Sequence, residues 1–130
     1  MGNSNSINRV NFERVKNIIQ NDDYIIINTL SNNKQDILIE KTLSIVQEET
    51  TLNILLKNNK QKKILIYGEN SCDISLVKKY NQLNKLGFTN LFIYIGGLFE
   101  WLLLNEIYGN QEFPIINKNN DIIIDILKFK

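Results

Sequence analysis

The sequence contains no histidine, one cysteine and one proline. Without histidine the chain lacks the commonest general base, the Cys-His and Ser-His nucleophile pairs, and the commonest metal ligand. A single cysteine cannot close an internal disulfide or form a Cys-x-x-Cys site, which favours a reducing compartment and therefore the cytoplasm. Any catalysis must rest on the thiol of Cys72 or on carboxylates, and we expect no cofactor and no metal.

The sequence also has no excess of either charge and no long apolar run. Lys plus Arg number 15 against 14 Asp plus Glu, so the net charge is +1. This balance offers no basic surface for a phosphate backbone, and nucleic acid is not an expected partner. No apolar run reaches the roughly 18 residues of a membrane span, and the N-terminus has no apolar secretion signal. The 130 residues fit a single domain with one core.

The first residues, MGNSNS, match the pattern for N-myristoylation, with Gly2 exposed once Met1 is removed and Ser6 in the preferred place. The alternative is a polar tail that matches the pattern by chance. One acyl chain supports only weak, reversible membrane binding, so any contact would be peripheral. We expect residues 1–8 to form a flexible tail and residues 9–130 the domain, with membrane contact only if Gly2 is myristoylated.

Extended and helical patterns alternate along the rest of the chain. Asn11 is a candidate N-cap for a first helix that stops by Gln20 to Asp23, and Asp73 and Gly109 mark the start of one later helix and the end of another. Such alternation predicts an α/β fold with a mostly parallel central sheet and helices on both faces. Strands are predicted at 24–30, 37–45, 62–68 and 90–96, later helices at 47–59, 73–87 and 97–109, and a short helix or strand at 121–130.

The stretch KKILIYGENSCDIS is the candidate site. A buried strand ends in glycine, a polar loop follows, and a helix begins at its N-cap. Ligands of such sheets bind beyond the carboxyl ends of the strands, and the free N–H groups at a helix N-terminus attract anions. The loop comprises Gly68, Glu69, Asn70, Ser71, Cys72 and Asp73.

A second stretch, LNKLGFTNLFIYIGGLFEW, gives the loop a context. It contains a helix ending in Leu-Gly-Phe, then a strand, then Gly96 and Gly97 followed by Trp101. This order resembles the second half of a rhodanese-like domain, in which an active-site loop and a Gly-Gly-x-x-x-Trp turn follow successive strands. The FPI at 113–115 is similar to a Leu-Pro-Val found near that domain's end. The resemblance implies the rhodanese-like fold and structural roles for the three matching residues.

The loop departs from the pattern that the resemblance implies for an active sulfurtransferase. Active members begin the loop with a persulfide-carrying cysteine and end it with arginine or lysine, whereas here Gly68 is first, Cys72 fifth and Asp73 last. The family's earlier Asp-x-Arg falls on residues 28–30, Asn-Thr-Leu. Glu69 and Asp73 place negative charge where an anionic donor needs positive charge. The same losses argue against the phosphatases that share this fold.

Three functions follow as alternatives. The first is a catalytically inactive rhodanese-like domain, a pseudoenzyme that serves as a binding or regulatory module for an unknown protein partner. The second is an atypical sulfurtransferase, persulfide carrier or redox sensor using Cys72, whose pKa a helix N-terminus would lower and neighbouring carboxylates would raise. The third is a structural subunit, monomer or homodimer, that docks through the apolar helix at 97–109. Within that helix we expect Trp101 in the core and Glu100 on the surface.

Overall fold

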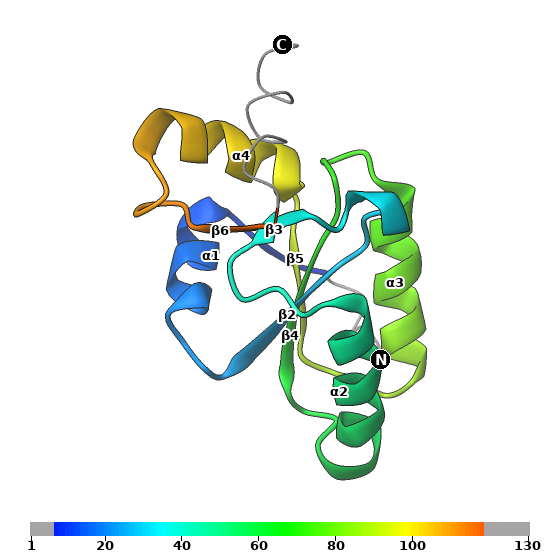
Figure 1. Ribbon diagram of the computed structural model, residues 1–130. Helices are drawn as coiled ribbons and strands as arrows, with labels where there is room; N and C mark the ends of the chain where they lie inside the picture. The colour runs from blue at the N-terminus through cyan, green and yellow to red at the C-terminus, as the bar shows by residue number, and fades with distance from the viewer. Residues whose placement is uncertain (1–6, 119–130) are drawn as a thin grey trace.

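The computed structural model describes residues 7–118, and a parallel sheet forms its centre (Figure 1). The position of Gly2 and the predicted element at 121–130 lie outside the described residues. The prediction of a mostly parallel sheet covered by helices on both faces is confirmed. The strand order is β1 (Asn8–Val10), β5 (Leu91–Tyr94), β4 (Lys63–Tyr67) and β2 (Tyr24–Asn28), and all neighbours are parallel.

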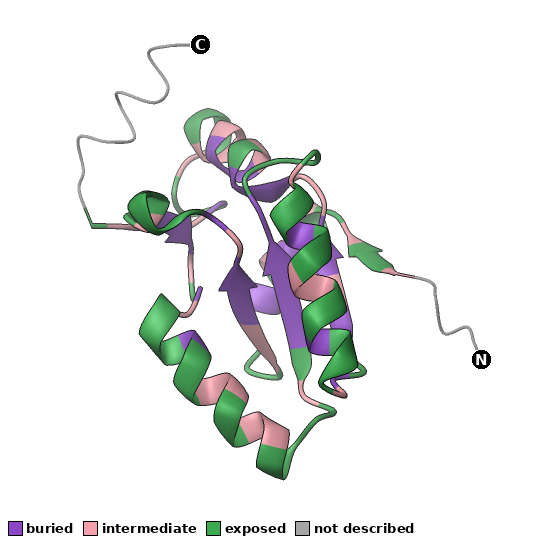
Figure 2. Ribbon diagram, turned by 90° about the vertical axis from the view of Figure 1, so that its right-hand side faces the viewer, coloured by how far each residue is buried: buried purple, intermediate pink, exposed green. Residues whose placement is uncertain are grey.

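The central strands separate two hydrophobic clusters because alternate side chains point to opposite faces. On β4, Leu65 and Tyr67 belong to one cluster, while Ile64 and Ile66 belong to the other. The first cluster includes residues of α1 (Phe12–Ile19) and α4 (Gly97–Tyr108), and the second is covered by α2 (Ile45–Asn58) and α3 (Ile74–Lys85). Figure 2 shows the strands buried between helices whose outer surfaces are exposed.

The predicted helix signals are largely confirmed. The side chain of Asn11 accepts a hydrogen bond from the Arg14 N–H at 3.0 Å, and that of Asp73 accepts one from the Ser75 N–H at 2.9 Å. Gly109, with a φ of 94°, follows the last residue of α4. Only the start of α2 was misplaced: a capping box on Ser44 begins the helix two residues before the predicted Gln47.

A small second sheet lies on the α1 and α4 side. The extended segment predicted at 37–45 forms a strand only over β3 (Ile37–Ile39), which pairs antiparallel with β6 (Ile115–Asn117) instead of joining the central sheet. Thr42 keeps a single parallel bridge to Ile26. The prediction did not include β1 or β6, because strands of three residues carry no usable periodicity. Between β2 and β3 the chain makes a short 3₁₀ turn, η1 (Asn32–Lys34).

Within residues 7–118, no helix is long and apolar enough to cross a bilayer.

Candidate functional site

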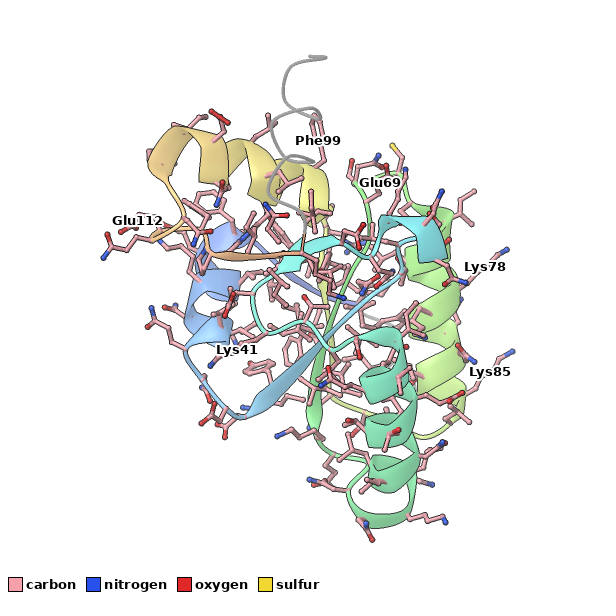
Figure 3. All side chains as sticks on the ribbon, in the orientation of Figure 1. Lys41, Glu69, Lys78, Lys85, Phe99 and Glu112 are labelled. Atoms are coloured by element: carbon pink, nitrogen blue, oxygen red, sulfur yellow. The ribbon has the colours of Figure 1, made fainter. Side chains whose placement is uncertain are left out.

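The loop from Gly68 to Asp73 joins β4 to α3 and lies against the start of α4. Gly68 is buried, and Glu69 to Cys72 are exposed. The N–H groups of Leu98 and Phe99, in the first turn of α4, donate to the carbonyl oxygens of Gly68 and Glu69, each at 2.9 Å. Figure 3 shows Glu69 and Phe99 at the same end of the molecule, one from the loop and one from the helix. The first amides of α4 therefore hold the loop backbone.

The carboxylate of Asp73 folds back across the loop. Oδ1 caps α3, while Oδ2 accepts hydrogen bonds from the Glu69 N–H at 3.0 Å and from the Thr29 hydroxyl at 3.3 Å. The loop thus directs a backbone amide at a negative charge supplied by its own last residue.

Gly68 has no room for a side chain while Asp73 stays in this position. A Cβ built on Gly68 would lie 2.2 Å from Oδ2 of Asp73 and 2.9 Å from the Thr29 hydroxyl oxygen. The first and last residues of the loop, which lie five positions apart in the sequence, are therefore next to each other in the structure. A cysteine at the first position and an aspartate in this rotamer at the last exclude each other.

Of the three residues that match the Gly-Gly-x-x-x-Trp pattern, Gly97 lies directly against the backbone of the loop. Gly97 has a φ of 69°, and a Cβ there would lie 2.8 Å from the carbonyl oxygen of Gly68. A Cβ on Gly96 would overlap the carboxylate of Glu100. Trp101 is fully buried, as predicted, and its Nε1 donates to the carbonyl oxygen of Pro114 at 3.0 Å.

Charge at the loop is partly paired. Glu69 forms an ion pair with Lys34 of η1 at 2.8 Å, and both side chains are about half exposed. No local sequence signal connects Lys34 with Glu69, because Lys34 belongs to a different loop, 35 positions away. Asn28, in the place of the family's acidic residue, is buried and exchanges hydrogen bonds with Gln35. Two loops that follow β2 and β4 therefore meet at this edge of the sheet.

Cys72 is exposed and takes no part in these contacts. Its N–H donates to Oδ1 of Asn70 at 2.9 Å, which forms a tight turn. The atoms nearest to a Cβ on Gly68 belong to Asp73 and Thr29. Within residues 7–118 the Cys72 thiol makes no hydrogen bond, and it lines neither cavity beside the loop.

Two tyrosines end the neighbouring strands β4 and β5. Burial, the largest cause, raises the pKa of Tyr67, whose hydroxyl contacts the Thr42 hydroxyl at 2.8 Å. Burial also raises the pKa of Tyr94, and so does Glu100, which accepts the Tyr94 O–H at 2.5 Å. Glu100 is half-buried, so its prediction as a surface carboxylate was wrong. Both phenols stay protonated near neutral pH and cannot serve as bases.

Two concave surfaces flank Phe99. An apolar cavity of about 280 Å³ lies between α4, η1 and β3, and an open groove of about 520 Å³ lies on the side of β1 and β5. Within residues 7–118, no group of three His, Cys, Asp or Glu side chains could hold a metal ion. The cavity is lined by Leu30, Asn33, Lys34, Asp36, Ile37, Glu69, Leu98, Phe99 and Leu102.

The sequence model of the rhodanese-like domain matches residues 8–104. The chain therefore belongs to the rhodanese-like domain family, as the resemblance in its second half predicted. No match was found among curated proteins.

Solved structures share the fold at low identity. The crystal structure of the Alr3790 protein from Anabaena sp. is 17% identical, with a TM-score of 0.62, and the match covers 92% of this chain and 89% of that one. A variant of EanB, solved with ergothioneine covalently linked to a persulfide cysteine, is 14% identical with a TM-score of 0.64. That match covers 86% of this chain and 28% of EanB. At these identities the similarity establishes the fold alone.

Proposed function

We propose that the chain is a catalytically inactive rhodanese-like domain that works as a binding or regulatory module. The observation that carries the proposal is the carboxylate of Asp73 in the space that a side chain at Gly68 would enter. Sulfur transfer in this family needs a nucleophilic thiol at that position, and glycine supplies none.

The hydrogen bonds inside the loop support the same conclusion. The Glu69 N–H donates to the carboxylate of Asp73. The N–H groups of Cys72 and Asp73 both donate to Asn70, the first to its side-chain oxygen and the second to its backbone carbonyl oxygen. An incoming thiosulfate would have to compete with an anion that is covalently attached and already hydrogen-bonded. Glu69 adds a second negative charge at the mouth, only partly offset by Lys34. The loop keeps the backbone shape of an anion-binding site, and the carboxylate of Asp73 occupies the position of the anion.

The direct test is a thiosulfate-to-cyanide sulfur-transfer assay on the wild-type chain and on the Cys72→Ser variant. Both should give the rate of the reaction without protein. Turnover by the wild type that disappears in Cys72→Ser would overturn the proposal in favour of a persulfide on Cys72. Alkylation of Cys72 at neutral pH should be as slow as that of an ordinary exposed thiol, because within residues 7–118 its thiol makes no hydrogen bond.

A gain-of-function pair tests the role of Asp73 itself. Gly68→Cys alone should fold less stably and react slowly, because the new Cβ meets the Asp73 carboxylate. Gly68→Cys with Asp73→Arg removes that carboxylate and supplies the positive charge that stabilises a thiolate. The introduced thiol should be alkylated faster in the double variant than in the single one. Equal rates would show that Asp73 does not block the loop.

The binding role is supported by the exposed residues around the loop. Phe99 is 53% exposed at the rim of the apolar cavity, and Ile107 and Tyr108 are exposed at the far end of α4. Exposed aromatic and aliphatic side chains of this size commonly mark protein contacts. A protein partner, or a second copy of the chain docking through α4, would cover them. Sedimentation equilibrium at micromolar concentration distinguishes a homodimer from a monomer.

We also propose a weak, reversible membrane tether through Gly2. The myristoylation pattern of the first six residues supports it, and β1 begins at Asn8, a few residues further on. Co-expression with N-myristoyltransferase should add one acyl chain to the wild type and none to Gly2→Ala. Only the acylated chain should sediment with lipid vesicles, and unmodified wild type would contradict the tether.

A further inference from the structure

The apolar cavity beside the loop is lined by one large aromatic side chain, Phe99, that remains exposed. Leu98 and Leu102 form part of its wall and are 8% and 6% exposed, whereas Phe99 between them is 53% exposed. The ion pair of Lys34 with Glu69 and the residue Asp36 provide charge among the lining residues. Burying apolar surface of this kind lowers the free energy by about 25 cal/mol for each Å² removed from water. A matching apolar segment would therefore bind there.

The chain itself leads to this cavity. In the antiparallel pair of β3 and β6, Asn117 lies opposite Ile37, and the Lys118 N–H donates to the carbonyl oxygen of Asp36 at 2.9 Å. Asp36 and Ile37 both line the cavity. The described chain therefore leaves β6 beside Asp36 and Ile37, at the rim of the cavity. Four further residues, extended, reach about 13 Å.

The sequence that follows Lys118 has the right chemistry. It reads NNDIIIDILKFK, and its first apolar residue is Ile122. At 100° per residue, one helical face would carry four aliphatic side chains and the opposite face three charged ones. The aliphatic face comprises Ile122, Ile123, Ile126 and Leu127, and the charged face comprises Asp121, Asp125 and Lys128.

We propose that residues 122–127 dock as one amphipathic segment into the apolar cavity and cover Phe99. Attachment through a short linker gives the segment an effective concentration on the order of millimolar, so even a weak contact is occupied. Any partner that uses this cavity must first displace the chain's own segment. The cavity is then a regulated binding site, whether or not the neighbouring loop has any catalytic activity.

The experiment uses the full chain with Cys72→Ser and Lys128→Cys, carrying a nitroxide on the introduced thiol. Paramagnetic broadening is read on the methyl groups of Ile37, Leu98 and Leu102. These signals should broaden, whereas those of Ile54, exposed on α2 on the opposite face of the sheet, should stay sharp.

Matched variants test the aliphatic face. Adding Ile123→Asp and Ile126→Asp should abolish the broadening, while Ile124→Asp, which lies near the charged face, should leave it unchanged. The docking is refuted if the cavity methyl groups stay sharp in the parent, or if the paired substitutions do not change the broadening. Broadening that is lost when the labelled chain is diluted into unlabelled chain would show docking between two copies and would also overturn the proposal.

Discussion

The loop between β4 and α3 and the turn between β5 and α4 follow neighbouring strands of one sheet and touch each other. The turn carries Gly96, Gly97 and Trp101, which match the pattern that the resemblance is based on, whereas the loop has Gly68 where the resemblance implies a cysteine and Asp73 where it implies arginine or lysine. The turn packs against the loop backbone through Gly97, at distances that leave no room for a side chain. The loop's side chains meet no such constraint from the turn, so packing preserves the backbone of the site and leaves its chemistry free to change.

The largest expected effect falls on the turn side, at Trp101. Trp101→Ala should lower the free energy of unfolding by about 3–5 kcal/mol, because it empties a fully buried position. Phe99→Ala, two positions earlier and half exposed, should cost less than about 1 kcal/mol. Urea unfolding followed by circular dichroism measures both. Similar losses would mean that α4 is not anchored through Trp101.

Gly97→Ala should lower the free energy of unfolding by about 2–4 kcal/mol, from a positive φ and a clash with the Gly68 carbonyl. Gly109→Ala is the matched control, since Gly109 has a φ of 94° but no atom within 4 Å of its Cβ position. It should cost about 1–2 kcal/mol. If both variants lose the same amount, the contact between turn and loop contributes nothing.

On the loop side, Asp73→Ala should cost about 1–2 kcal/mol, the usual loss of an N-cap. Asp73→Asn keeps a side-chain oxygen for the Ser75 N–H and should cost less. Hydrogen exchange at the Glu69 amide should accelerate in Asp73→Ala, because that amide loses its acceptor. Unchanged exchange would show that the carboxylate does not occupy the loop in solution.

The strand-end tyrosines predict a pH dependence. Folded Tyr67 has a raised pKa, whereas in the unfolded chain tyrosine ionises near pH 10. Its contribution to stability is therefore complete below about pH 10 and is lost progressively above it, by up to about 1.4 kcal/mol per pH unit. In Tyr67→Phe the free energy of unfolding should fall less steeply above about pH 10, because one ionisable group fewer is titrated on unfolding. An equally steep fall would mean that Tyr67 ionises freely in the folded chain.

The smallest effect concerns the rim. A double-mutant cycle with Lys34→Ala and Glu69→Ala should give a coupling below about 1 kcal/mol, because both side chains are half exposed. Coupling should fall further in 1 M salt, where screening is strong. A coupling well above 1 kcal/mol would identify the rim as a rigid part of the site.

Sequence patterns predicted the elements that have strong local signals. The N-caps Asn11 and Asp73 and the stop at Gly109 depend on residue types within a few positions of each other, and the alternation of strand and helix patterns along the chain indicated the parallel sheet. The three-residue strands β1 and β6 and the antiparallel pairing of β3 have no such signal, because they depend on distant partners.

The site was predicted in part for the same reason. Spacing indicated that Gly68 and Asp73 begin and end one loop, and the negative charges of Glu69 and Asp73 argued against anion binding. Spacing did not indicate that the Asp73 carboxylate lies beside Gly68, or that Glu100 accepts a hydrogen bond from the Tyr94 hydroxyl. Both contacts depend on rotamers that are set by three-dimensional packing.

The hydrogen bond from Trp101 to Pro114 has a practical consequence. The chain has one tryptophan, and its indole N–H is bound to the segment that leads into β6, with its ring edge-on to those of Phe113 and Tyr94. Its fluorescence emission therefore reports on the attachment of β6. If β6 detaches from β3 before the central sheet unfolds, the emission should shift to the red while the circular dichroism is still native, and the natural sequence then contains its own optical probe of the edge beside the candidate site.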